Sequence, residues 1–416
     1  MSDSPERTRE LSSWKEIAVF LGISVRAAQN WERERGLPVK RLPGKRSVVS
    51  ASPAELDGWR SSQEAAAGTP ARTARGVIGI GLGILALLVT TAGYAAYHLV
   101  SRRGGLPSTF RVEQNAVIVL DDRGQTLWRK VFPQNLIQDE YNKSDVKTLH
   151  RFWVGDLDSD GRPEVLFVEQ SAAYSDPGYL LCYSASGNLK WQFRVGKRVT
   201  SKRSLPSDIF RIKDFAVAPL GRNGAPVIVV TSAQAQVPDY PDQVVLLDAN
   251  GKCLGEYWHS GWLEFVAVSG HDIFLGGVSN GNHAATIVVL NANDVSGVSA
   301  ESDPDFQISG FPLAHEKARV FFPRTCINRT KEPYNYLTVM TLNGDTVTAE
   351  IAELPPPTPA LIWYQLGLDL QLKGVEPHDT FISLHSEMQA KNQLDHGFST
   401  KEREALRNVR VVRNGE

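Results

Sequence analysis

Four carboxylates stand in a short stretch with a spacing that suits a hard metal cation. Asp156, Asp158 and Asp160 alternate along the chain, a glycine follows, and Glu164 comes shortly after it. Alternating carboxylates around a glycine turn direct their oxygens toward one point, and Ca²⁺ prefers oxygen ligands. The sequence therefore predicts a Ca²⁺ site in this stretch, with a metal-free aspartate-rich turn as the alternative.

Other residue types that carry catalysis are present but dispersed. The histidines show no Ser/His/Asp or His/Glu spacing that indicates a shared catalytic centre. Cys182, Cys253 and Cys326 stand alone, without a C-x-x-C pair, so they predict neither a zinc site nor a disulfide framework. A single disulfide bridge between two of them is the alternative. A redox cofactor in the large domain would lack a ligating motif. We therefore expect no enzymatic activity and no cofactor besides Ca²⁺.

A long uncharged stretch, residues 76–100, organises the chain. Its 25 residues contain no Asp, Glu, Lys or Arg, and arginines flank it on both sides. An α-helix rises about 1.5 Å per residue, so about 20 residues cross the hydrocarbon layer of a membrane. We therefore expect a single transmembrane helix rather than a buried core helix. It would separate an amino-terminal part of net charge +4 from a carboxy-terminal part of net charge −5.

Two capping signals predict two short helices near the start of the chain. Ser13 begins an S-x-x-E capping box ahead of a helix at residues 14–21, and Ser24 is the N-cap of a second helix at residues 25–35. A turn that contains glycine joins them. Residues 39–49 then form two β-prone runs around a cation-rich Pro-Gly turn, and a further helix follows.

This order of helix, turn, helix, basic hairpin and helix resembles the MerR-type and excisionase-type winged helix-turn-helix domains over residues 11–62. The likeness is carried by SWKEIAVFLGISVRAAQNWERERGLPV and LPGKRSVVS. It implies DNA binding, with the second helix in the major groove. The residues that it places at the DNA are Ser24, Arg26, Ala27, Gln29 and Asn30 on the helix, and Lys40, Arg41, Lys45 and Arg46 on the hairpin. The helix would read base edges and the hairpin would hold phosphates. A degenerate winged helix that binds protein is the alternative.

The large carboxy-terminal part consists of short β-prone runs that repeat. One hairpin occurs at residues 116–128, 179–191 and 244–258, with turn glycines 63 and 64 residues apart. A second repeated unit lies between these hairpins, at residues 154–168 and 217–230. Four-strand units that recur about every 40 to 65 residues are typical of a β-propeller. A β-sandwich is the alternative, and we expect five to seven blades.

These hairpins resemble quinoprotein-like propeller blades, and the aspartate-rich unit resembles the FG-GAP or VCBS repeats of integrin-type propellers. The latter resemblance implies a short Ca²⁺ loop in which the carbonyl of Arg162 joins the side chains of Asp156, Asp158, Asp160 and Glu164. An EF-hand fits less well, because its twelfth loop position would be Phe167, inside an evident strand.

The expected fold is therefore multidomain: a small α winged helix-turn-helix domain, one transmembrane helix and a large all-β domain, with a β-propeller favoured. The expected boundaries are a winged helix at 1–62, a flexible linker at 63–75, the span at 76–100, the propeller at 101–355 and a strand and helix appendage at 356–416.

The predicted function is a membrane-anchored bacterial transcriptional regulator. Its amino terminus would lie in the cytoplasm and its propeller outside the inner membrane, where it would sense a ligand. The expected partners are DNA, the membrane, an extracytoplasmic ligand or protein, and a second copy of the chain as a homodimer. The alternative is a cell-surface binding or adhesion propeller with a vestigial winged helix.

Overall fold

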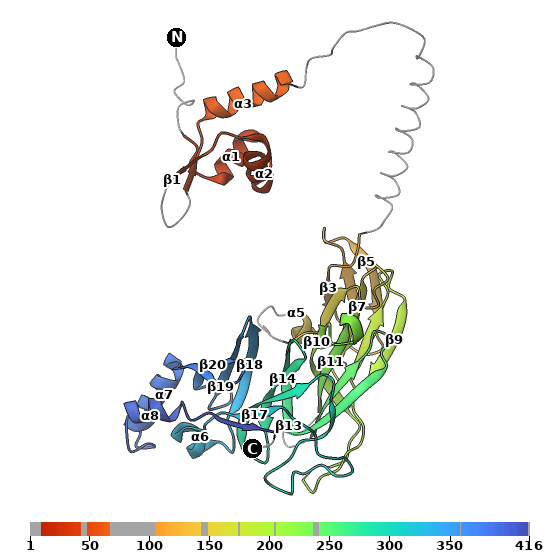
Figure 1. Cartoon of the computed structure of the whole chain (residues 1–416), viewed down its shortest axis with the longest axis vertical. Helices are drawn as coiled ribbons and strands as arrows, with labels where there is room; N and C mark the ends of the chain where they lie inside the picture. Colours follow the sequence, from red (N-terminus) through yellow and green to blue (C-terminus); the bar gives the residue numbers. More distant parts are fainter. Residues whose placement is uncertain are drawn as a thin grey trace. The chain divides into compact units, whose positions relative to one another are not determined.

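The computed structural model describes residues 10–42, 48–66, 105–142, 149–173, 175–203, 205–235, 241–357 and 359–414. The chain divides into two compact units, Met1–Val100 and Ser101–Glu416. Figure 1 shows the small unit as a group of helices with one hairpin, and the large unit as a succession of sheets.

The small unit follows the local signals of its sequence closely. Its elements are α1 (Trp14–Leu21), α2 (Val25–Arg35), β1 (Lys40–Leu42), β2 (Val48–Ser50) and α3 (Pro53–Ala66). The hydroxyls of Ser13 and Ser24 each accept a hydrogen bond from the backbone of the following helix, at 3.2 Å. Gly22 ends α1 in the left-handed conformation, with φ at 69°. Glycine adopts this conformation without strain, and Gly22 therefore sets the turn between the two helices.

Apolar residues from all three helices form the core of the small unit. Ile17, Ala28 and Leu56 are fully buried, one from each helix. Trp31 and Trp59 pack at 5.8 Å between ring centroids. The indole N–H of Trp59 also donates to the carbonyl of Arg35 at 3.0 Å, which ties α3 to the end of α2.

The expectation of a membrane span is corrected by the helices of the structure. Among the described residues, no helix combines the length and the apolar character needed to cross a bilayer. The longest described helix, α3, has 14 residues and carries charged side chains; it would extend about 21 Å against a hydrocarbon layer of about 30 Å. The predicted fold class with a transmembrane helix and the predicted single-pass location in the inner membrane are therefore wrong. Residues 76–100 themselves lie outside the described residues.

The large unit begins with two antiparallel sheets whose strands are neighbours in sequence. The first sheet contains β3 (Thr109–Glu113), β4 (Ala116–Leu120) and β5 (Thr126–Val131). The short helix α5 (Gln138–Asn142) follows. The second sheet contains β6 (Phe152–Gly155), β7 (Glu164–Glu169), β8 (Tyr179–Tyr183) and β9 (Leu189–Arg194).

The middle of the large unit is built on one long strand, β13 (Cys253–Ser269). Its first half pairs with β12 and its second half with β14. The two halves meet at Gly261, where φ is 125° and a Cβ would lie 2.0 Å from the carbonyl oxygen of Val278. A side chain would not fit there. Glycine therefore allows the backbone of β13 to lie close to β14 at the point where the strand passes from one sheet into the next.

The strands on each side of β13 complete two further meanders. On one side lie β10 (Phe210–Ala218), β11 (Val227–Gln234) and β12 (Pro241–Leu247), with the short 3₁₀ helix η1 (Arg222–Gly224) between β10 and β11. On the other lie β14 (Asp272–Ser279), β15 (Ala284–Asn291), β17 (Ala318–Phe321) and β22 (Arg410–Arg413), while β16 (Ser296–Val298) pairs in parallel with β13. The carboxy-terminal strand β22 therefore pairs back onto the sheet through β17.

The last sheet contains β18 (Tyr336–Asn343), β19 (Thr346–Ala352), β20 (Leu361–Gly367) and β21 (Leu372–Pro377). It extends the β region past the expected limit at residue 355. Figure 1 shows α6 (Cys326–Lys331), α7 (Asp379–Ala390) and α8 (Thr400–Ala405) gathered beside this sheet. Within the described residues, five consecutive antiparallel meanders thus make up a large, all-β, propeller-like domain.

Two tryptophans lock neighbouring sheets together at the repeated hairpins. The indole N–H of Trp128 in β5 donates to the carbonyl of Ala185 in the next hairpin turn, at 3.0 Å. Trp191 in β9 repeats the contact on the carbonyl of Ala249, at 2.8 Å. A Cβ on Gly251 would lie 2.7 Å from the Trp191 ring. The two tryptophans are 63 residues apart, and each one packs on the glycine turn of the following sheet. We call this repeated contact the tryptophan interlock.

We expect Trp191→Phe to destabilise the large unit by about 1 kcal/mol, because the ring is retained while the carbonyl of Ala249 loses its donor. Chemical denaturation of the full chain would measure this. Trp363→Phe is the control, since its indole bonds the carboxylate of Glu350 at an exposed site where water can substitute. Equal effects of both substitutions would contradict the interlock.

Candidate functional site

The residues assigned to base recognition lie at the N-cap and in the first two turns of α2. The hydroxyl of Ser24 is occupied as the N-cap, where it accepts from the backbone N–H of Ala27. Arg26 is exposed and Asn30 is half-buried, and Gln29 is half-buried beside them. At the spacing of an α-helix, Arg26 and Asn30 lie on one face.

Arg33 continues this face and was missed by the sequence analysis. Its guanidinium donates to Oδ1 of Asn30 at 2.7 Å. The spacing of Arg26, Asn30 and Arg33, at i, i+4 and i+7, is the signal that would have found it. A face with two exposed arginines and one half-buried amide has the donors and acceptors that suit the edges of guanine and adenine.

The cations of the hairpin are engaged by carboxylates of the neighbouring helices. Lys40 contacts Glu55 at 3.3 Å, and Arg41 makes a bidentate pair with Glu32 at 3.0 and 2.7 Å. The hydrogen bonds that Arg41 donates to Glu32 raise the pKa of Arg41. A phosphate would have to displace these exposed partners. Lys45 and Arg46 lie outside the described residues.

The aspartate loop is stabilised mainly by its own backbone. Asp156 accepts from the N–H groups of residues 160 and 161, at 3.1 and 3.0 Å, and Asp160 accepts from the N–H of Arg162 at 2.7 Å. Glu164 is buried and accepts from the N–H of Leu157 at 3.0 Å. Among the described residues, the oxygens of Asp156, Asp158 and Glu164 converge within 4.8 Å of one another, while Asp160 is not part of this group.

A lysine from β9 occupies the position where a cation would be expected. The ammonium of Lys190 lies 2.6 Å from Asp158 Oδ2 and 2.9 Å from Glu164 Oε1. Its hydrogen bond lowers the pKa of Asp158. The side chain comes from a strand that the sequence analysis did not connect with the loop. Ca²⁺ at this loop stays a prediction, and it requires the ammonium to be displaced.

We expect Lys190→Met to enlarge the rise in Tm that millimolar Ca²⁺ produces in the full chain. Removal of the ammonium leaves two carboxylates without their cation, and each tenfold gain in affinity adds up to about 1.4 kcal/mol of stabilisation. Differential scanning calorimetry with and without Ca²⁺ would measure the effect, with Asp158→Ala in the same background as control. An unchanged response in Lys190→Met would show that this lysine does not compete with the metal.

The large unit also contains a cavity of about 450 Å³ that is lined in part by the paired strands β17 and β22. Its lining includes Glu301, Glu316, Arg319, Phe321 and Arg410. We call it the Arg319 cavity. Its size falls in the range usual for small-molecule sites. No sequence motif indicates this cavity, because β22 reaches β17 only through the topology of the sheet.

The floor of the Arg319 cavity is a buried charge network. The guanidinium of Arg319 donates to Glu316 at 2.8 Å and to the carbonyl of Ala300 at 3.0 Å. Tyr257 donates to the same glutamate at 2.7 Å. Burial raises the pKa of Glu301 to about 7, although the nearby Arg319 opposes the shift. The charge of the cavity therefore changes near neutral pH.

The rim of the Arg319 cavity presents a stacked arginine. The guanidinium of Arg410 lies 4.1 Å from the centre of the Phe321 ring. Its Nη2 donates to Oδ1 of Asn282 at 2.9 Å, which holds the guanidinium in place. A planar guanidinium fixed in this way suits a carboxylate or phosphate group of a ligand.

We expect Glu301→Gln to remove part of the pH dependence of folding stability. Because the folded-state pKa of Glu301 lies above its ordinary value of 4.5, its protonated form is stabilising; this contribution is complete below pH 4.5 and is lost as the pH rises through about 7. As the pH falls between those limits, the free energy of unfolding of the wild-type protein should rise by up to about 3 kcal/mol relative to that of the variant. Urea unfolding at several pH values would measure it.

Glu404→Gln, at an exposed position of α8, is the control for this pH profile. The dependence of its folding stability on pH should match that of the wild-type protein. Parallel profiles for Glu301→Gln and the wild-type protein would contradict the assignment.

Comparisons with known proteins give only distant likenesses. No protein-family model and no curated protein matches the sequence. Among solved structures, BamB from Moraxella catarrhalis is similar at 12% identity and a TM-score of 0.34, with 66% of this chain and 59% of that chain covered. A eukaryotic initiation factor is similar at 9% identity and a TM-score of 0.29, with 65% and 62% covered.

A third likeness is to BBS1N in complex with ARL6DN, at 11% identity and a TM-score of 0.28, with 66% of this chain and 83% of that chain covered. The chain spans about six tenths of the length of the first two structures that it matches. At these TM-scores the likenesses do not assign the chain to a family.

Proposed function

We propose that this protein is a DNA-binding transcriptional regulator whose large unit binds a small anionic ligand. One observation carries the proposal: α1, the glycine turn and α2 are followed by the β1–β2 hairpin and α3, in the order of a winged helix-turn-helix. In that fold the second helix enters the major groove of DNA.

The packing of α2 supports this role. Ala28 is fully buried against the core, so the opposite side of α2 faces outward with Arg26. The packing of Trp31 against Trp59 and the hydrogen bond from Trp59 to the carbonyl of Arg35 hold the carboxy-terminal end of α2 against α3. A helix fixed at its end presents its side chains with little loss of freedom on binding. One such helix covers a half-site, so we further propose that two copies of the chain bind together.

The proposed ligand site is the Arg319 cavity. Arg410 is oriented by Phe321 and Asn282, which supports recognition of a carboxylate or phosphate. Glu301 loses its charge as the pH falls through about 7, and this loss would favour an anion.

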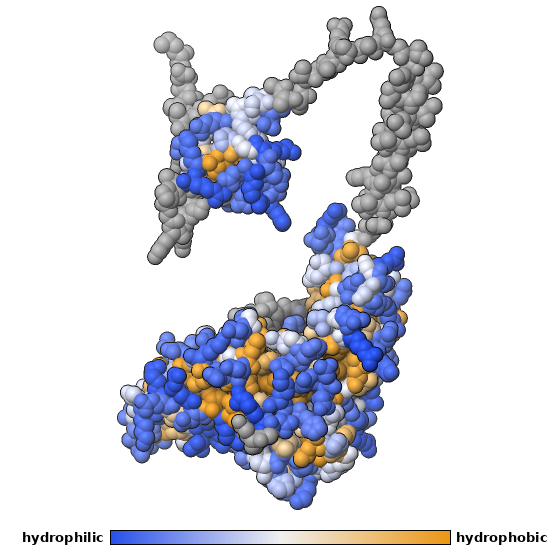
Figure 2. Space-filling view, in the orientation of Figure 1, coloured by the Kyte–Doolittle hydropathy of each residue, from blue (hydrophilic) through white to orange (hydrophobic). Residues whose placement is uncertain are grey.

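One observation favours a second function for the small unit, the binding of a protein. Val19 is 74% exposed, and Phe20 and Val25 are more than a third exposed. Figure 2 shows an apolar patch on the visible face of this unit, within a largely hydrophilic surface. Together with the neutralisation of Lys40 and Arg41 by glutamates, this patch fits a protein partner.

Selection from a random pool of DNA duplexes with the full chain would test the proposal. We expect an enriched sequence, and a log–log salt dependence of binding that reflects phosphate contacts. Failure to enrich any sequence, together with loss of binding at physiological salt, would favour the protein-binding function.

We expect Arg26→Ala to relax the base preference at one position of the enriched sequence, at a cost of about 1–3 kcal/mol. Arg46→Ala should weaken binding to all sequences alike and reduce the salt slope by about one unit. Fluorescence anisotropy on matched and mismatched duplexes would separate the two effects. Lys391→Ala, on the surface of the large unit, is the control, and the reverse pattern would contradict the proposed docking of α2.

A further inference from the structure

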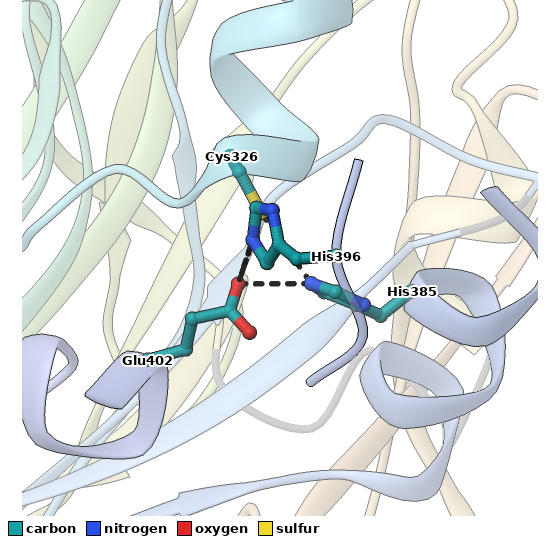
Figure 3. A group of neighbouring side chains, drawn as sticks. All are labelled: Cys326, His385, His396 and Glu402. Carbon is teal, nitrogen blue, oxygen red and sulfur yellow. Dashed lines mark hydrogen bonds and ion pairs between the residues drawn. The ribbon is translucent and has the colours of Figure 1, made fainter. Parts of the chain in front are cut away.

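Four side chains with metal-binding atoms meet among the helices beside the last sheet. Cys326 is the first residue of α6, His385 lies in α7, and Glu402 lies in α8. His396 lies in the segment between α7 and α8. Figure 3 shows the four side chains pointing toward one another from these separate elements.

The distances within this cluster are those of a compact site. Oε1 of Glu402 lies 2.9 Å from Nε2 of His385, 3.0 Å from Nε2 of His396 and 3.2 Å from Sγ of Cys326. The sulfur lies 3.5 Å from Nε2 of His385. Within the described part of the chain, all four donor atoms lie within 4.8 Å of one another.

We infer that Cys326, His385, His396 and Glu402 bind a divalent transition-metal ion, with Zn²⁺ as the ion that fits best. One thiolate, two imidazoles and one carboxylate are the ligand types that zinc uses, and four such ligands complete a tetrahedron. Zinc–ligand bonds of about 2.0 to 2.3 Å place ligand atoms about 3.3 to 3.7 Å apart. The three separations from Oε1 of Glu402 need to widen by only a few tenths of an ångström, and the 3.5 Å between the sulfur and Nε2 of His385 already fits.

Bonds around the ligands support this inference. Nδ1 of His396 lies 2.6 Å from the carboxylate of Asp395. A carboxylate behind the second ring nitrogen is usual for a metal-bound histidine, since it fixes the tautomer with Nε2 free for the metal. Oε2 of Glu402 accepts from the backbone N–H of Ser399 at 3.0 Å. This capping-box contact positions Glu402 and leaves its Oε1 directed at the cluster.

Charge balance also suits this location. His385 is fully buried, and an uncompensated charge beside it would be unfavourable. When Zn²⁺ binds, the thiol of Cys326 loses its proton to solvent, and the histidines coordinate through the lone pair of Nε2. The dication is then balanced by one thiolate and one carboxylate, so the site as a whole is neutral.

A cysteine nucleophile activated by His385 is the competing explanation. Such a site needs an acceptor on the ring nitrogen opposite the cysteine, to orient the imidazole. Here Glu402 and Cys326 both contact Nε2 of His385, while Nδ1 has no hydrogen-bond partner in the described structure. This geometry lacks the third member of a triad and instead directs all the donors at one point.

Access for an ion is provided by a cavity of about 230 Å³. Cys326, His396 and Glu402 line it together with Phe381. The ligands come from positions 59 and 76 residues apart along the chain for the pairs Cys326–His385 and Cys326–Glu402. A bound metal would therefore crosslink α6, α7 and α8.

Titration of the chelator-treated full chain with Co²⁺ tests this inference. We expect one Co²⁺ per chain at this site, with the intense visible absorption of a four-coordinate ion and a thiolate-to-cobalt band in the near ultraviolet. Zn²⁺ should displace the cobalt. A chain without visible absorption at millimolar Co²⁺ would overturn the inference.

Matched variants assign the ion to these residues. Cys326→Ser should remove the thiolate band, whereas Cys253→Ser, at an exposed site, should retain it. Asp395→Ala should keep the spectrum and weaken binding about 10- to 100-fold. Because the side chain of Asp395 is 96% exposed, this variant keeps the fold. A thiolate band that persists in Cys326→Ser would overturn the inference.

A labelling experiment provides a readout that does not depend on the variants. Zn²⁺ should slow the modification of Cys326 by a thiol reagent in the wild-type chain and leave that of Cys253 unchanged, as measured by peptide mass spectrometry. Equal rates for Cys326 with and without Zn²⁺ would overturn the inference.

Discussion

The large unit depends on each sheet being covered by the next, and the indole-to-carbonyl contacts of Trp128 and Trp191 fix how neighbouring sheets meet. An indole ring covers apolar area while its N–H needs an acceptor. The carbonyl of a tight turn supplies that acceptor, and the glycine of the turn leaves space for the ring. Burial and polar satisfaction are thus achieved by one residue.

The sequence predicted the elements whose causes are local. Ser13, Gly22 and Ser24 set the helices of the small unit through caps and one left-handed turn, and the observed bounds agree with these signals. The hairpin repeat predicted the antiparallel meanders, since its turns recur in sequence. The uncharged stretch at 76–100 predicted a transmembrane helix, and no described helix has the length and apolar character of one.

The sites that the analysis missed join residues far apart in the chain. Asn282 and Arg410 are 128 residues apart, and Lys190 in β9 reaches Asp158 in the loop between β6 and β7. Spacing in sequence carries no information about such pairs until the topology is known. Cys326 illustrates the point, since no C-x-x-C partner accompanies it and its neighbours come from later helices.

The left-handed glycine in the middle of β13 has a mechanical consequence. Because one unbroken backbone serves two sheets, tension on either sheet is carried directly to the other through Gly261 instead of being absorbed by a loop. Relative rotation of the two sheets would require hydrogen bonds to break along the same strand. The two sheets that share β13 should therefore move as one rigid body under force. Bending of the large unit should occur where neighbouring sheets are joined by loops.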